Sequence, residues 1–172
     1  MTYNNIFNSF QKWCLDKTEL GFILNVYPFG NMFSIKDTQL EGITLKLNDS
    51  FLKQHNLKWD DSRFNTEKYV STILQVNGQQ VQKINIFAIS NELNLPNIYV
   101  QTGLNNIFKA IGSILTTNTN CVIELGSMGN LFCLNKLVYH LPSKNKSDQT
   151  VKKVRVILVN NKANSKKPNA IG

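Results

Sequence analysis

The chain has 172 residues, 42% of them hydrophobic, and it carries a formal net charge of +8 at pH 7. This composition is typical of a globular protein rather than a disordered one, and no apolar run approaches the roughly 20 residues that span a bilayer. With three scattered cysteines, and without the basic start and apolar run of a secretory signal, the sequence predicts an intracellular protein with no disulfide framework.

The positive charge is concentrated at the carboxyl end. Residues 144–172 contain eight basic side chains and one acidic side chain, Asp148, whereas residues 1–143 contain eleven basic and ten acidic ones. The extension therefore carries a charge of +7 and the body +1. A basic extension favours an anionic partner such as nucleic acid, a membrane surface or an acidic protein face, although a solubilising tail has the same composition.

Hydrophobic periodicity predicts a helix, a three-stranded meander and a short helix in the first part of the chain. Ile6, Phe10 and Trp13 fall at helical spacing and give the first helix. The strands alternate apolar and polar residues around a tight turn, and Asn48 to Ser50 form a helix cap. The expected elements lie at residues 6–14, 23–26, 29–35, 42–47 and 51–57.

The second part begins with two helices. Helix 84–93 is closed by Pro96, and helix 100–115 carries an apolar stripe in which Gly103 and Gly112 either weaken the helix or permit close packing. A hairpin, a third strand joined through a two-residue turn, and one more strand follow. Beyond that strand the composition is that of a disordered tail. The expected strands lie at residues 122–125, 128–134, 137–141 and 154–159.

An internal repeat relates the two parts. Residues 29–35 reappear as residues 128–134, an offset of 99, and at the same offset residues 23–26 match residues 122–125. Both copies follow a predicted helix, so the similarity extends over a helix and hairpin unit. Duplication is the better interpretation of this pattern than chance similarity.

Two helices, a three-stranded meander and a small following element make up the half-dimer of the bacterial HU/IHF proteins. The sequence resembles a eukaryotic branch of that superfamily, the tandem HU-like domains of the coiled-coil-domain-containing protein eighty-one family. The resemblance covers about residues 6–142 and implies an α+β fold in which two HU/IHF-like domains, each with helices packed on a three-stranded antiparallel meander, form an intrachain pseudo-dimer. It is carried by the helix with Trp13 and by residues 24–33, 45–52, 84–90, 100–115 and 124–129.

The domain division that follows has four parts. Residues 1–58 form a first HU-like domain that lacks its leading helix, 59–82 a linker, 83–142 the second HU-like domain, and 143–172 a basic extension with one strand and a disordered end. The family's coiled coil is also absent. The apolar face left open by the missing helix could be covered by the linker, the extension or a partner.

The resemblance implies a non-catalytic structural protein of the ciliary axoneme or basal body. Its expected partners are tubulin in the doublet-microtubule wall, on the inside or outside, or other axonemal proteins; no cofactor, small-molecule substrate or membrane is expected. The alternative is an HU-derived nucleic-acid-binding protein that uses the basic extension. DNA bending of the HU type is not expected, because it needs a long basic ribbon arm and the strand connections here are short.

Catalytic and metal-binding chemistry has little support in the sequence. His55 and His140 lie at no recognisable spacing from a nucleophile or an acid, and Cys121 and Cys133 alternate with apolar strand residues as buried side chains do. We therefore expect no catalytic, cofactor or metal site.

Two groups of residues are candidates for partner binding. The first consists of extension cations facing an anionic surface: Lys144, Lys146, Lys152, Lys153, Arg155 and Lys162. The second consists of aromatic residues on the first hairpin, which either fill the interface between the two copies or form a partner-facing patch: Phe22, Tyr27, Phe29 and Phe33.

Overall fold

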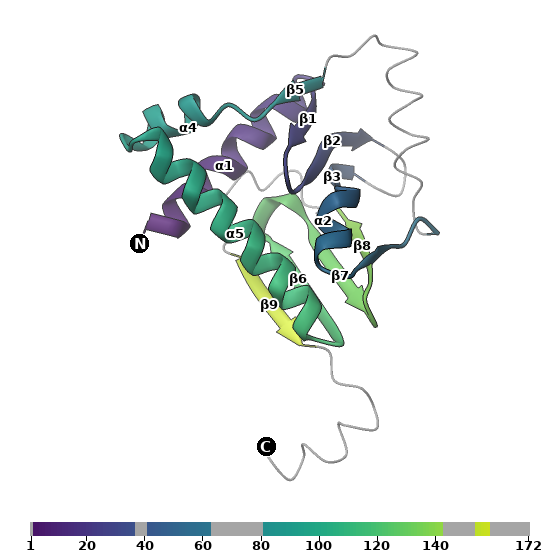
Figure 1. The fold of residues 1–172 in the computed structure, drawn as a ribbon. Helices are drawn as coiled ribbons and strands as arrows, with labels where there is room; N and C mark the ends of the chain where they lie inside the picture. Colours follow the sequence, from purple (N-terminus) through teal and green to yellow (C-terminus); the bar gives the residue numbers. More distant parts are fainter. Residues whose placement is uncertain (1, 37–40, 63–80, 143–153, 159–172) are drawn as a thin grey trace.

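The structure, a computed structural model, describes residues 2–36, 41–62, 81–142 and 154–158. Helix α1 begins the first repeat and is followed by a meander and a short helix (Figure 1). The bounds of these elements are α1 Thr2–Glu19, β1 Ile23–Val26, β2 Gly30–Lys36, β3 Glu41–Leu47, α2 Asp49–Gln54 and β4 Lys58–Trp59.

The second repeat starts with a short strand and two helices, α4 and α5, and then forms its own meander. A 3-10 turn, η1, takes the place of the hydrogen-bonded turn at residues 27–29 of the first hairpin. The bounds are β5 Val81–Lys83, α4 Ile86–Leu93, α5 Asn97–Thr117, β6 Asn120–Leu125, η1 Gly126–Met128, β7 Asn130–Leu134, β8 Leu137–Leu141 and β9 Val154–Leu158.

The strands form two sheets, in the orders β3-β2-β1-β5 and β4-β8-β7-β6-β9. The meander strands pair antiparallel, whereas β5 pairs parallel with β1 and β4 pairs parallel with β8, so both sheets are mixed. The prediction of an α+β fold with two HU-like units is confirmed by this arrangement. Strands β4 and β5 lie at the two ends of the range 59–82 that was predicted to be a linker.

The two meanders are built in the same way. Strands β1, β2 and β3 correspond to β6, β7 and β8. Each meander is extended at its first strand by one more strand: β5 pairs with β1 in one sheet, and β9 pairs with β6 in the other. Gly30 and Gly129, which the 99-residue offset relates, lie where a Cβ atom would collide with the backbone of a neighbouring strand, at the carbonyls of Lys46 and Leu141. The same close approach therefore recurs in both hairpins.

Local sequence explains how several elements end. Helix α2 starts at Asp49, after Asn48, and its last turn is followed by Asn56 with a φ of 54°, so it is shorter at its carboxyl end than predicted. The turn between β7 and β8 consists of Asn135 and Lys136, both with positive φ, which is the twist that a two-residue hairpin requires.

One apolar core serves both repeats. Helix α1 packs against α4 and α5, and strand β3 contacts β8 (Figure 1). The buried residues of the two repeats form a single cluster that includes Phe10, Leu45, Phe108 and Leu131. Gly103 of α5 allows this packing, because a Cβ atom there would lie 2.6 Å from Cδ1 of Ile6 in α1.

Candidate functional site

The interface between the repeats is aromatic at its centre. The ring of Phe29, at the start of the first hairpin, stacks on Phe108 of α5 with centroids 4.5 Å apart, and Phe51 meets Phe29 edge-on at 5.3 Å. Phe10 of α1 contacts the same Phe108 ring at 5.8 Å. Such pairs stabilise by about 0.5–1.5 kcal/mol beyond the burial of their area.

His140 of β8 links three elements within the buried interface. The main-chain N–H of Leu45 in β3 donates to Nδ1 of the ring at 3.3 Å, and Nε2 lies 2.6 Å from the carbonyl oxygen of Met128 in η1. A ring that accepts at Nδ1 and donates at Nε2 is neutral. Burial lowers the pKa of the ring to about 4, and the hydrogen bond to Met128 offsets only part of this effect. His140 is therefore a structural hydrogen-bonding group rather than an acid or base poised near neutral pH.

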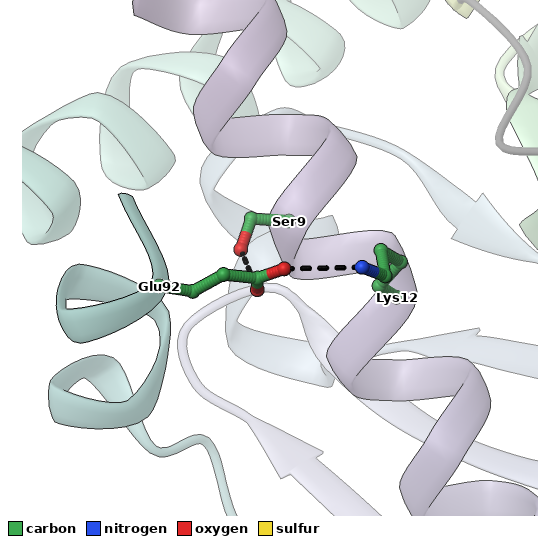
Figure 2. Close-up of polar contacts among 3 residues, drawn as sticks. All are labelled: Ser9, Lys12 and Glu92. Atoms are coloured by element: carbon green, nitrogen blue, oxygen red, sulfur yellow. Dashed lines mark hydrogen bonds and ion pairs between the residues drawn. The ribbon is translucent and has the colours of Figure 1, made fainter. Parts of the chain in front are cut away.

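Polar side chains complete the contact between α1 and the second repeat. Glu92 of α4 accepts a hydrogen bond from the Ser9 hydroxyl at 2.6 Å and pairs with the Lys12 ammonium at 3.1 Å (Figure 2). The Ser9 hydrogen bond is the largest cause of a lowered pKa at Glu92. In addition, Gln11 Oε1 accepts from the N–H of Ser127 at 2.9 Å. Because the Glu92 carboxylate is largely exposed, its contacts orient α4 against α1 but add little to the free energy of unfolding.

The four aromatic residues proposed as one patch do not share a surface. Phe29 and Phe33 are buried, Phe22 is half-buried against the core, and Tyr27 is 70% exposed. Phe29 contacts Phe51 and Phe108, as expected of a residue that fills the interface between the two repeats rather than a partner-facing patch. Tyr27 is the member of the group that a partner could reach.

The extension is described over β9. Of the six cations proposed to face an anionic surface, Arg155 lies in this strand, while Lys144, Lys146, Lys152, Lys153 and Lys162 lie outside the described residues. Its guanidinium Nη2 is 2.6 Å from Oε1 of Glu124 on β6, and its side chain remains 69% exposed. Strand β9 therefore fixes the basic extension to the edge of the second sheet mainly by backbone pairing, since all five of its residues are exposed.

The thiols and the second histidine also have structural surroundings. Cys121 and Cys133 lie directly opposite each other on β6 and β7, and Cys14 is buried in α1. A hydrogen bond with Cys133, together with burial, raises the pKa of the Cys121 thiol, and burial raises that of Cys14. His55 lies against α5 at Gly112, and burial lowers its pKa.

Within the described ranges, no group of three or more His, Cys, Asp or Glu side chains could hold a metal ion. None of the helices in the described part of the chain is long and apolar enough to cross a membrane.

Comparison with known proteins identifies the second repeat. No curated protein shows significant similarity to the chain. Residues 80–139 match the family described as CCDC81 eukaryotic HU domain 2, and the matched range runs from the start of β5 into β8. The first sheet, with its equivalent strand order, suggests a tandem arrangement. Residues 80–139 are thus similar to the CCDC81 eukaryotic HU domain 2.

Proposed function

We propose that the protein is a non-catalytic architectural component of the ciliary axoneme or basal body, which binds the doublet-microtubule wall or a microtubule-associated protein. The ciliary setting rests on the family that the second repeat resembles. The observation that carries the architectural role is the single core shared by both repeats, which makes the body one stiff unit with its reactive side chains buried or paired.

The distribution of charge supports an acidic protein surface as the partner. The body has a net charge of +1, whereas the extension, which β9 anchors at the edge of the second sheet, has +7. The body would then make contacts of defined shape, and the extension would lie along acidic side chains. Tubulin provides such a surface.

The hairpins do not favour DNA bending as the role. The β7–β8 connection is the two-residue turn Asn135–Lys136, and the β2–β3 ladder continues as far as the pair Lys36 and Glu41, which leaves four residues between the strands. Neither hairpin offers the long basic arm with an apolar tip that inserts into a minor groove. Sequence-independent binding to phosphates through the extension is the competing outcome of the test below.

The first experiment is to locate a tagged protein in ciliated cells and then to extract the cilia with detergent and high salt. Retention in the extracted axoneme is the expected result. A nuclear signal, or complete release into the soluble fraction, would overturn the proposal and bring nucleic-acid binding forward.

The second experiment compares binding to purified axonemal doublets and to duplex DNA by co-sedimentation. A variant with Gln at the six extension cations should lose doublet binding. A control with the same loss of charge on the body should keep it. The nucleic-acid alternative would be supported if the chain bound DNA but not doublets. The logarithm of its association constant for DNA should then fall with the logarithm of salt concentration, with a slope of about −0.9 per phosphate contact. The body lysines replaced in the control are Lys12, Lys17, Lys53, Lys58, Lys83 and Lys136.

A further inference from the structure

Two of the three cysteines lie side by side in the second sheet. Cys121 and Cys133 are direct partners in the antiparallel ladder of β6 and β7, and both are buried. The main-chain hydrogen bond from Asn135 to Thr119 lies two residues farther along each strand, so the cysteines also form a hydrogen-bonded pair, with Cα atoms about 5.5 Å apart. This separation lies within the range of about 4.4–6.8 Å that a disulfide bridges.

The side chains of this pair also contact each other. The Cys121 and Cys133 thiols are joined by a hydrogen bond, so they point to the same side of the sheet and toward one another. The third cysteine, Cys14, lies in α1, outside this ladder. Formation of a disulfide between the two strands therefore requires the side chains to rotate but leaves the pairing of β6 with β7 unchanged.

The two thiols differ in reactivity. The hydrogen bond with Cys121 lowers the pKa of the Cys133 thiol to about 7; burial opposes this effect, and Lys136 adds to it. The same hydrogen bond raises the pKa of Cys121. Thiol–disulfide exchange starts from a thiolate and is fastest when the pKa of the attacking thiol is near the ambient pH. Cys133 is thus suited to attack an oxidant, and Cys121 is suited to resolve the product.

We infer that Cys121 and Cys133 form a redox-modification site, at which a small disulfide of the glutathione type converts the two thiols into a reversible disulfide between β6 and β7. The Cys133 thiolate attacks one sulfur of the oxidant and forms a mixed disulfide, while the other sulfur leaves as a thiolate. Cys121 then gives up its proton and attacks the Cys133 sulfur, which releases the second thiolate. In total the chain loses two electrons and two protons, and the oxidant is reduced to two thiols.

Oxidation also changes the end of α5. The Cys133 thiol donates to the carbonyl oxygen of Leu115 at 3.6 Å. Leu115 lies in the last turn of α5, where carbonyls have no N–H partner within the helix. A disulfide has no S–H group, so this hydrogen bond is lost when the disulfide forms. The inference concerns the core and not the basic extension, and it does not depend on the ciliary proposal.

The test is an equilibrium of the full chain with reduced and oxidised glutathione. It is started from the reduced chain and, separately, from a chain oxidised in urea and refolded. Because both thiols are buried, exchange requires local opening, and the approach from both sides ensures that equilibrium rather than rate is measured. After alkylation, cleavage at Lys109 and Lys136 places both cysteines in one peptide, and cleavage after Glu124 leaves two pieces that only the disulfide joins.

The disulfide between Cys121 and Cys133 should be the main oxidised form of the folded chain, with Cys14 left as a free thiol. Its equilibrium constant against glutathione should be about tenfold or more higher in buffer than in urea, where the sheet no longer holds the two thiols together. The matched control Cys14→Ala should keep this constant. Cys121→Ala should leave only glutathione adducts.

A second measurement tests the link to α5. Disulfide formation should shift the NMR signal of the Leu115 carbonyl carbon, and Cys133→Ala should shift it in the same direction because it also removes the donor. Cys121→Ala, which keeps the Cys133 thiol, is the control and should shift this signal less.

Three outcomes would overturn the inference. The first is an equilibrium constant in buffer no higher than that in urea. The second is a folded chain that ends as a glutathione adduct of Cys133 instead of the intrachain disulfide. The third is a disulfide that joins Cys14 to either of the other cysteines in the folded chain.

Discussion

The rings of Phe29 and Phe108 lie parallel, with an interplanar angle of 4° and centroids 4.5 Å apart. Phe29 belongs to the hairpin of the first repeat, and Phe108 belongs to the long helix of the second. This contact lies within a cluster to which both sheets contribute. The two repeats are therefore expected to unfold together as one cooperative unit, although each has its own sheet.

Truncation of the stacked ring should destabilise both repeats at once. We expect Phe29→Ala to lower the free energy of unfolding by about 3–5 kcal/mol, as for other buried phenylalanines. Urea unfolding followed separately by Trp13 in α1 and Trp59 in β4, each as the sole tryptophan, should shift by the same amount. The control Tyr27→Ala, at a 70% exposed position, should change stability by less than about 0.5 kcal/mol. Two separate transitions would contradict the shared core.

The repeat and the class of fold were predictable from local sequence. Hydrophobic spacing and the recurring turn at Gly30 and Gly129 are local signals, and they gave both meanders and the long helix α5. Strands β4 and β5 have two and three residues, too few for a period to be recognised. Their formation depends on sheet edges that only the folded chain provides.

The candidate site was less predictable, because its parts are distant in sequence. The stacked rings of Phe29 and Phe108 belong to different repeats, so their contact depends on the packing of both. The hydrogen bond from Leu45 to His140 joins residues 95 positions apart, so no local pattern could have indicated a neutral, buried ring.

Gly112 should be intolerant of a side chain for a reason specific to His55. A Cβ atom at this position would collide with the imidazole ring, so Gly112→Ala should destabilise the chain by about 1–3 kcal/mol despite the better helix propensity of alanine. In the background of His55→Ala the collision disappears, and the same substitution should be neutral or stabilise by up to about 1 kcal/mol. A double-mutant cycle in urea measures this coupling. Additive effects would show that the ring is not the obstacle.

The three cysteines should react only when the chain unfolds. Cys14, Cys121 and Cys133 are buried, and a raised pKa at Cys14 and at Cys121 further reduces their thiolate fractions. The hydrogen bond with Cys121 lowers the pKa of Cys133 to about 7, so burial alone protects this thiol. A reagent whose absorbance changes when it reacts with a thiol should therefore label no cysteine quickly in buffer, and it should label all three in urea. Rapid native labelling of any one, assigned by mass spectrometry, would mean that its part of the core opens locally.

Stability should decline between pH 6.5 and 4 because of His140. The folded ring has a pKa of about 4, below the ordinary value of 6.5, so the unfolded chain binds a proton in this range before the folded chain does. The stabilisation is complete above pH 6.5, is lost as the pH falls, and amounts to about 3 kcal/mol in total. At pH 5 the loss should be about 2 kcal/mol.

The substitution His140→Gln removes the titrating ring. The difference in the free energy of unfolding between the unmodified chain and this variant should therefore shrink by that amount from pH 7.5 to pH 5. Carboxylates such as Glu92 titrate equally in both chains and cancel. His55→Gln should change the pH dependence in the same direction, because burial lowers the pKa of His55 too. An unchanged difference would show that folding does not lower the pKa of the His140 ring.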